Sequence, residues 1–177
     1  GLFGYSKIGK LVANYGKAFG MSVTAWGRES TLERARADGI ETAPSKEALF
    51  ENSDVLCLLL KLTEETRGIV TLADLQRMGP EALLVNTSRA ELIESDALVL
   101  ALNRGRPGMA AVDVFESEPI LQGHPLLRME NVICTPHIGF VEADSYELYF
   151  RAAFENIVAW VAGTPKNIVN GAALAKQ

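Results

Sequence analysis

The chain has 177 residues, 48% of them apolar, which is enough to bury one hydrophobic core. Its 17 basic and 22 acidic residues leave a net charge of -5, without a basic run that would follow a phosphate backbone, so we expect no nucleic-acid partner. No stretch approaches the roughly twenty apolar residues of a membrane helix and no charged-then-apolar leader opens the chain, so we expect a cytoplasmic protein with no membrane partner.

Short apolar runs alternate with helical patterns along the chain. The opening GLFG resembles the end of a buried strand, and five further runs are typical of strands: 22–26, 55–60, 82–85, 109–114 and 132–134. This alternation predicts a parallel sheet with crossover helices. Because the runs are nearly continuous rather than alternating, we expect helices on both faces of the sheet. The predicted fold class is therefore α/β, doubly wound, in three α/β/α layers, with residues 1–177 forming a single domain.

Capping residues mark the expected helix boundaries. Ser30 and Glu33 have the spacing of a capping box, and Ser45 and the pair at 95–96 each precede a helical pattern. Three glycines are expected to close helices: Gly20, Gly39 and Gly105.

A last helix is expected over about residues 142–162. Its apolar stripe consists of Tyr146, Phe150, Ala153, Ile157 and Trp160. Such a stripe needs a partner surface, and packing on the core of this domain is favoured over docking against a domain missing from this chain. Because the chain opens with Gly1 in what looks like a strand already in progress, we expect it to be a fragment.

The opening segment GLFGYSKIGKLVA has the spacing G-x-G-x-x-G between an expected strand and helix, with Ser6 at the middle glycine. Gly4 would permit the tight turn and Gly9 the close packing of helix on strand, and a dinucleotide pyrophosphate would bind at the helix N-terminus. The Ser6 hydroxyl can donate a hydrogen bond, but its Cβ crowds the phosphates, and an ordinary strand–turn–helix is the alternative. The context favours a Rossmann-type fold. The residues expected to bind the cofactor here are Gly4, Tyr5, Ser6, Lys7, Ile8 and Gly9.

The end of the second run bears on the choice between NAD and NADP. Gly27 occupies the position where a carboxylate would hold the ribose 2'-hydroxyl of NAD, and Arg28 follows it. Since a guanidinium can bind a 2'-phosphate bidentately, the sequence slightly favours NADP as the cofactor. The alternative is a solvated Arg28 paired with Glu29.

Three motifs then follow in order: LVNTSRAELIESDALVLAL, AAVDVFESEP and NVICTPHIG. On these motifs the chain resembles the D-isomer-specific 2-hydroxyacid dehydrogenase family over essentially its whole length. The resemblance implies reversible hydride transfer between NAD or NADP and a D-2-hydroxy acid or 2-oxo acid, as in glyoxylate and hydroxypyruvate reductases or phosphoglycerate dehydrogenases. It also implies a homodimer and a substrate domain that should precede this chain.

The same resemblance implies catalytic roles for Arg89, Glu118 and His137, with Asp113 near the nicotinamide carboxamide. It places Leu60, Lys61, Thr87 and Ser88 among the cofactor-binding residues. His137 would supply the proton for the developing alkoxide, and Glu118 would favour and orient its imidazolium. Arg89 would bind the substrate carboxylate and polarise the carbonyl.

Each of these residues has a plainer alternative when taken singly. Arg89 can be a surface charge at a strand end, Glu118 a turn residue and His137 a capping residue. Arg89, Asp113 and His137 nevertheless all follow expected strand ends, where ligands bind in open α/β sheets. Their position favours the catalytic interpretation.

Residues in two segments depart from the family pattern, and a second histidine lies outside it. Lys61 replaces a common proline, and residues 90–91 read Ala-Glu where relatives usually have Gly-Pro, so Glu91 can redirect substrate choice. Lys61 can face a phosphate, an acidic substrate or solvent. His124 has no acid at matching spacing and is expected to be structural.

Two other functions fit the fold. One is a catalytically inactive regulatory module that senses NAD(P); the other is an enzyme of another class, such as an adenosyl-cofactor hydrolase. The three candidate catalytic residues count against the first and the ordered motifs against the second. Cys57 and Cys134 lie in apolar runs, which favours a reducing compartment, and we expect no metal site. Without the preceding domain, we expect this chain to bind cofactor with little or no turnover.

Overall fold

The computed structural model describes residues 1–172 of the chain. The chain divides into two compact units, residues 1–137 and 138–177. The first unit contains the sheet and every residue expected in the site, and the second contains the long helix α6 (Ala143–Val161). Among residues 1–172, no helix combines the length and the apolar character that a membrane span requires.

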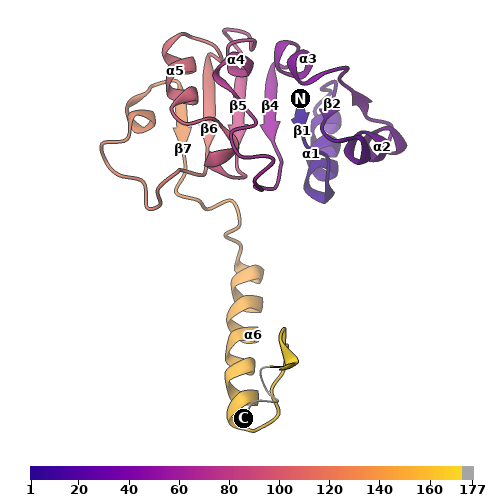
Figure 1. Cartoon of the computed structure of the whole chain (residues 1–177), viewed down its shortest axis with the longest axis vertical. Coiled ribbons are helices and arrows are strands. Elements are labelled where there is room, and N and C mark those ends of the chain that lie inside the picture. Colours follow the sequence, from indigo (N-terminus) through magenta and orange to yellow (C-terminus); the bar gives the residue numbers. More distant parts are fainter. Residues whose placement is uncertain (173–177) are drawn as a thin grey trace. The chain divides into compact units, whose positions relative to one another are not determined.

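The strands of the described residues form one parallel sheet (Figure 1). They are β1 (Leu2–Phe3), β2 (Thr24–Trp26), β3 (Glu41–Thr42), β4 (Val55–Leu58), β5 (Leu83–Asn86), β6 (Met109–Val112) and β7 (Val132–Cys134). Their order is β3-β2-β1-β4-β5-β6-β7, and every neighbouring pair is parallel. The order therefore reverses between β1 and β4, at the point where ligands bind in doubly wound sheets. The predicted Rossmann-type α/β class is confirmed.

Helical segments connect the strands. They are α1 (Lys7–Ala18), α2 (Glu29–Ala37), α3 (Lys46–Glu51), α4 (Leu72–Leu75), α5 (Ala97–Asn103) and the short 3-10 helices η1 (Ala90–Leu92) and η2 (Pro125–Arg128). Because crossovers between parallel strands are right-handed, the two halves of the sheet carry their helices on opposite faces. All five expected runs contain a strand, whereas β3 was not predicted because its two residues form no apolar run.

The helix boundaries follow local hydrogen bonding. The Ser45 side chain accepts a hydrogen bond from the Ala48 N–H (3.1 Å), which confirms its capping role. The prediction for Ser30 is wrong, because α2 begins at Glu29 and the Arg28 carbonyl already accepts the first helical hydrogen bonds. The three glycines expected to end helices all directly follow the C-caps with positive φ: Gly20, Gly39 and Gly105.

Aromatic packing fixes the strand ends beside the switch point. Phe3 at the end of β1 is 1% exposed, and its ring lies edge-on to Trp26 and Phe50 with centroid distances of 5.1 and 6.1 Å. Burial of such a side chain stabilises the fold by roughly 1.5–3 kcal/mol. The loops that leave β1 and β2 therefore start from a packed aromatic cluster.

The second unit exposes its apolar side chains. All five residues of the expected stripe on α6 are exposed, and further apolar side chains around the helix are exposed as well: Leu148, Tyr149, Phe154, Val158 and Val161. The rings of Tyr146 and Phe150 contact one another, with centroids 5.8 Å apart. The expectations of a single domain and of a missing preceding domain stay predictions.

Candidate active site

The glycine turn after β1 is shaped by the neighbouring strand end. Gly4 has a φ of +103°, and a Cβ there would lie 2.8 Å from the Leu59 carbonyl oxygen and 3.0 Å from the Leu60 side chain. A Cβ at Gly9 would lie 3.1 Å from the Gly4 carbonyl oxygen. Both glycines therefore make the tight turn and close approach expected of them. This leaves a bare backbone cradle at the N-terminus of α1.

The start of α1 suits an anion. Ser6 is the exposed N-cap, its extended φ of -120° fits a serine without strain, and its hydroxyl caps no backbone N–H. The first turn of α1 has no acidic residue, and it begins with Lys7. Free N–H groups and the positive end of the helix dipole fit the pyrophosphate of a dinucleotide.

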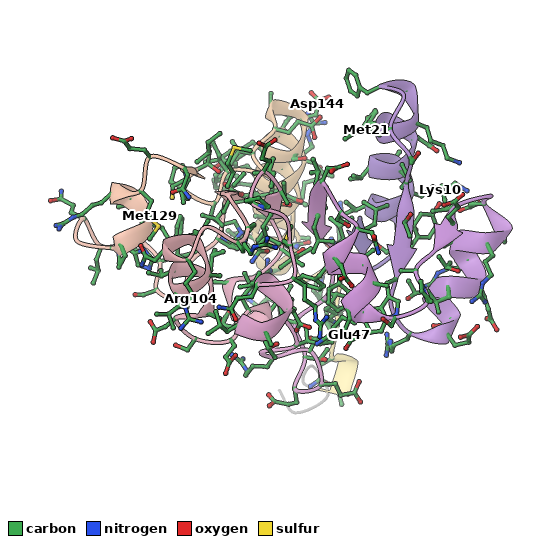
Figure 2. The ribbon with its side chains drawn as sticks, turned by 90° about the horizontal axis from the view of Figure 1, so that it is seen from above. Lys10, Met21, Glu47, Arg104, Met129 and Asp144 are labelled. Atoms are coloured by element: carbon green, nitrogen blue, oxygen red, sulfur yellow. The ribbon has the colours of Figure 1, made fainter. Side chains whose placement is uncertain are left out.

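The side chain of Tyr5 points away from this cradle. It is 3% exposed, and its hydroxyl donates to Asp38 Oδ2 at 3.0 Å, while Lys10 Nζ donates to Asp38 Oδ1 at 2.7 Å. Figure 2 labels Lys10 on α1. Burial and then the bond to Asp38 raise the pKa of Tyr5 to about 12. Only the backbone of Tyr5 is thus presented to a ligand, and no sequence signal identified Asp38 as its partner.

The end of β2 presents an available guanidinium. A Cβ at Gly27 would lie 2.9 Å from the Thr31 side chain, so β2 and α2 approach closely here. Arg28 is exposed, and within residues 1–172 it has no ion pair. Glu29 pairs with Arg36 (Nη1 to Oε1, 2.9 Å) rather than with Arg28. The expected alternative of an Arg28–Glu29 pair is therefore wrong.

The loop after β4 lies across the switch point from the glycine turn. Leu60 is half-buried against Gly4, and the Lys61 side chain is exposed. The Thr66 hydroxyl donates to the Lys61 carbonyl at 2.7 Å and accepts from the Thr63 N–H at 2.8 Å. This closed loop presents Lys61 beside the cofactor cradle.

Asn86 organises the turn that carries Arg89, and the sequence analysis missed it. Its side chain is 1% exposed, donates to the Arg89 carbonyl at 2.9 Å and accepts from the Ser88 N–H at 3.1 Å. The Ser88 hydroxyl ties the turn to β4 through the Leu58 carbonyl (2.8 Å), and Thr87 is exposed. Arg89 is exposed, and its Nη1 donates to the Ser88 carbonyl at 2.6 Å. An asparagine directly at a strand end was the available signal.

The structure brings His137 and Glu118 together. His137 Nδ1 lies 2.7 Å from Glu118 Oε2, and the Phe115 N–H donates to Glu118 Oε1 at 3.0 Å. The bond to His137 and then that to Phe115, helped by the charge of Arg89, lower the pKa of Glu118 below its usual 4.5. Because the carboxylate is ionised near neutral pH, the proton in this hydrogen bond resides on Nδ1. The second ring nitrogen, Nε2, lies on the side of the ring that faces away from Glu118.

Asp113 follows β6 and is 4% exposed. The Thr135 hydroxyl donates to its Oδ1 at 2.5 Å, a contact that the sequence analysis did not anticipate. A cavity of about 500 Å³ lies beside the His137–Glu118 pair and is lined by Phe115, Glu118, Pro119, Ile120, Pro136 and His137. The residues expected to bind cofactor and those expected to act on substrate thus lie near the carboxyl ends of the parallel strands.

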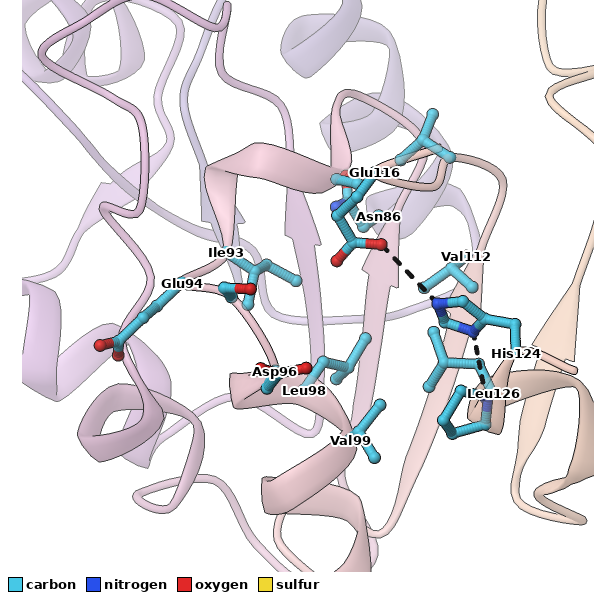
Figure 3. A pocket seen from close by; sticks show the side chains of 14 residues that line it. Asn86, Ile93, Glu94, Asp96, Leu98, Val99, Val112, Glu116, His124 and Leu126 are labelled. Atoms are coloured by element: carbon cyan, nitrogen blue, oxygen red, sulfur yellow. Dashed lines mark hydrogen bonds and ion pairs between the residues drawn. The ribbon is translucent and has the colours of Figure 1, made fainter. Parts of the chain in front are cut away.

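A second cavity, of about 280 Å³, contains the other histidine (Figure 3). His124 Nδ1 accepts from the Leu126 N–H at 3.3 Å, and its Nε2 lies 3.8 Å from Glu116. His124 therefore caps η2, in line with the structural role expected for it.

Comparisons with known proteins agree with this geometry. The family model for the NAD binding domain of D-isomer specific 2-hydroxyacid dehydrogenases matches residues 1–139. The chain is 39% identical over 171 residues to a glyoxylate reductase of Aeropyrum pernix and 34% identical over 172 residues to a hydroxypyruvate reductase of Blautia hydrogenotrophica, covering 96% of this chain and 51% and 52% of those proteins. It spans about half the length of these curated relatives.

The chain is also similar in fold and sequence to a solved structure. The crystal structure of an oxidoreductase from Ralstonia solanacearum has 65% sequence identity and a TM-score of 0.94, covering 98% of this chain and 51% of that one. The sheet order, the glycine cradle and the matched family model together confirm the resemblance found in the sequence. The chain belongs to the NAD-binding domain family of the D-isomer specific 2-hydroxyacid dehydrogenases.

Proposed function

We propose that this chain is the cofactor-binding half of an enzyme that reversibly transfers a hydride between NAD or NADP and a D-2-hydroxy acid or 2-oxo acid. The observation that carries the proposal is the 2.7 Å contact between His137 and Glu118. The charge of Arg89, which follows β5, also helps to lower the pKa of Glu118, and this supports placing Arg89 in the same site as the Glu118–His137 pair.

The side chains divide the chemistry of reduction. A dinucleotide whose pyrophosphate is held at the cradle would supply the hydride from its nicotinamide ring. His137 Nε2 donates the proton to the developing alkoxide, and ionised Glu118 holds the ring and stabilises its charged form. Arg89 exchanges its bond to the Ser88 carbonyl for the substrate carboxylate. Asp113 orients the carboxamide of the nicotinamide ring.

We infer that the substrate is a small 2-oxo acid, as in the relatives named glyoxylate reductase and hydroxypyruvate reductase. The alternative is a substrate of the phosphoglycerate type, as in a Vibrio cholerae relative that is named phosphoglycerate oxidoreductase and is 48% identical. The exposed Lys61, together with Glu91 beside Arg89, provides the charges that would separate these substrates.

NADP is favoured over NAD because Arg28 is exposed and not engaged by Glu29. A relative that is 28% identical, an acyclic imino acid reductase, is described in complex with NADPH. The Arg28 guanidinium suits a ribose 2'-phosphate, and the glycine at position 27 offers no competing carboxylate.

The parts of the enzyme outside this chain are proposed from its exposed apolar surfaces and from the greater length of its relatives. Because the relatives are about twice as long, a substrate domain outside this chain would close over His137 and cover the exposed side chains of α6. A homodimer is proposed through the outer face of α1, where Ile8, Leu11, Tyr15 and Phe19 are 55–84% exposed. The unpaired Cys57 and Cys134 support a cytoplasmic location.

The test is a rate comparison of the full-length enzyme with NADH and NADPH across glyoxylate, hydroxypyruvate, pyruvate and longer 2-oxo acids. We expect one of these acids to be reduced, and His137→Ala to lower kcat/KM about 10²- to 10⁴-fold. Arg28→Ala should weaken turnover with NADPH alone. An unchanged rate for His137→Ala would favour an NAD(P)-sensing module without catalysis, and an equal loss with both cofactors would reject the role of Arg28.

A further inference from the structure

Thr135 lies where two neighbouring strands end. β6 and β7 are paired in register with Val112 opposite Cys134, so the next residues, Asp113 and Thr135, leave the sheet side by side. The Thr135 N–H donates to the Val112 carbonyl at 3.0 Å, which continues the ladder by one residue. The position of the Thr135 side chain is therefore fixed by the sheet and not by a loop.

The Thr135 hydroxyl makes a short bond to a buried carboxylate. Its Oγ1 donates to Asp113 Oδ1 at 2.5 Å, within the range of charge-assisted O–H···O⁻ bonds, and Asp113 is 4% exposed. The carboxylate of an aspartate turns about its last side-chain torsion, and a hydrogen bond to one oxygen restricts that rotation. The hydroxyl therefore helps to set the direction in which Asp113 can accept a hydrogen bond.

Thr135 is also tied to the proton donor. The His137 N–H donates to the Thr135 carbonyl at 3.0 Å, in a turn that gives His137 a φ of +53°. His137 contacts Glu118, and Glu118 accepts from Phe115, two residues after Asp113. A closed circuit of hydrogen bonds and short chain segments thus joins Asp113, Glu118, His137 and Thr135.

We propose that Thr135 is a positioning residue that orients Asp113 toward the nicotinamide ring and holds it in register with the imidazole of His137. This inference rests on the proposed function, because it assumes that Asp113 receives the nicotinamide. It assigns to Thr135 an effect on the nicotinamide half of the cofactor only, since the adenosine half binds at β1 and β2.

The experiment compares the binding of whole cofactors with that of fragments lacking nicotinamide. Calorimetric titration of the 177-residue chain with NADH, NADPH, ADP-ribose and 2'-phospho-ADP-ribose gives one Kd for each. In Thr135→Val, which keeps the volume and removes the hydroxyl, we expect the Kd of the preferred reduced cofactor to rise about tenfold. The Kd of the matching fragment should change less than twofold. Thr135→Ser should restore tight binding, and Thr164→Val, at an exposed threonine remote from the sheet in sequence, should resemble the wild type.

A double-mutant cycle on the cofactor Kd provides a second measurement. Asp113→Ala removes the carboxylate that accepts from Thr135, so it should cause the same selective loss, and adding Thr135→Val to it should cause little further loss. If Thr135→Val does not fold, Thr135→Ala and Asp113→Ala form the same cycle. Equal weakening of cofactor and fragment, or wild-type binding of NADH and NADPH by Thr135→Val, would overturn the inference. Failure of the wild-type chain to bind either cofactor would instead overturn the proposed function.

Discussion

Individual side chains of the candidate site each make two hydrogen bonds. Glu118 uses one oxygen for the Phe115 N–H and the other for His137, so the same carboxylate closes a turn and orients the ring. Asn86 likewise closes the turn that presents Arg89. A single substitution at either position would therefore change both local structure and chemistry.

The pH dependence of stability should reveal the Glu118 contact. Its lowered pKa means that the contribution to stability is fully present above the usual value of 4.5 and is lost as the pH falls through the lower, folded-state pKa. Urea denaturation should show that Glu118→Gln is less stable than the wild type at pH 7 and that the difference shrinks under more acidic conditions. A difference that grows as the pH falls would contradict this assignment. Glu130→Gln, at an exposed carboxylate between η2 and β7, is the control.

At the scale of elements, the glycine turn shows how the end of one strand restricts which residue can follow the neighbouring strand. The space at Gly4 is removed by the end of β4 and not by α1. Two distinct constraints therefore act at Gly4, a positive φ and a crowded Cβ position.

Gly4→Ala should differ in cofactor affinity from a control substitution that introduces similar backbone strain. At Gly20 the φ is +79° and nothing lies within 4 Å of an added Cβ, so Gly20→Ala tests strain alone. Gly20→Ala should lower the free energy of unfolding by about 1–3 kcal/mol, and Gly4→Ala should lower it further because its Cβ would also crowd the Leu59 carbonyl. Only Gly4→Ala should also raise the Kd of NADPH, by about tenfold or more, in a fluorescence titration. Equal cofactor binding by the two variants would show that the contact with β4 is irrelevant.

The sequence predicted elements where a residue pattern is local. Six of the seven strands in the described residues and three glycine helix ends were found in this way, whereas β3 was not, since an edge strand of two residues needs no apolar run. In the site, Arg89, Glu118 and His137 were predicted from ordered motifs, and the structure brings Glu118 and His137 into contact. Asp38 and Thr135 were missed because their partners are 33 and 22 residues away and meet them through sheet geometry, which a residue pattern does not contain.

At the scale of the whole molecule, two apolar surfaces call for partners. The face of α1 belongs to the unit that contains the sheet, and the side chains of α6 belong to the second unit. Large exposed apolar surfaces of this kind mark interaction sites. We assign the first to a second copy of the chain and the second to the substrate domain.

Substitution on α1 tests the proposed homodimer. Charged groups placed in an apolar interface leave unpaired charges when it is buried, so Leu11→Glu combined with Tyr15→Glu should convert the dimer to a monomer. Size-exclusion chromatography with light scattering would show the mass halved. Leu121→Glu, at a residue 71% exposed in the loop before η2, should remain dimeric. A monomeric wild-type chain, or a double variant that stays dimeric, would contradict the assignment.

The hydrogen-bonded circuit of Asp113, Glu118, Thr135 and His137 comes from one uninterrupted stretch of sequence, residues 113–137. The guanidinium of Arg89 and the glycine cradle come from earlier segments. Under the proposed function, the residues for proton delivery therefore lie in one continuous segment, whereas those for anion binding lie in several earlier segments. Grafting residues 113–137 between relatives would then transfer the proposed proton donor with its hydrogen-bond partners and leave the choice of substrate to the recipient.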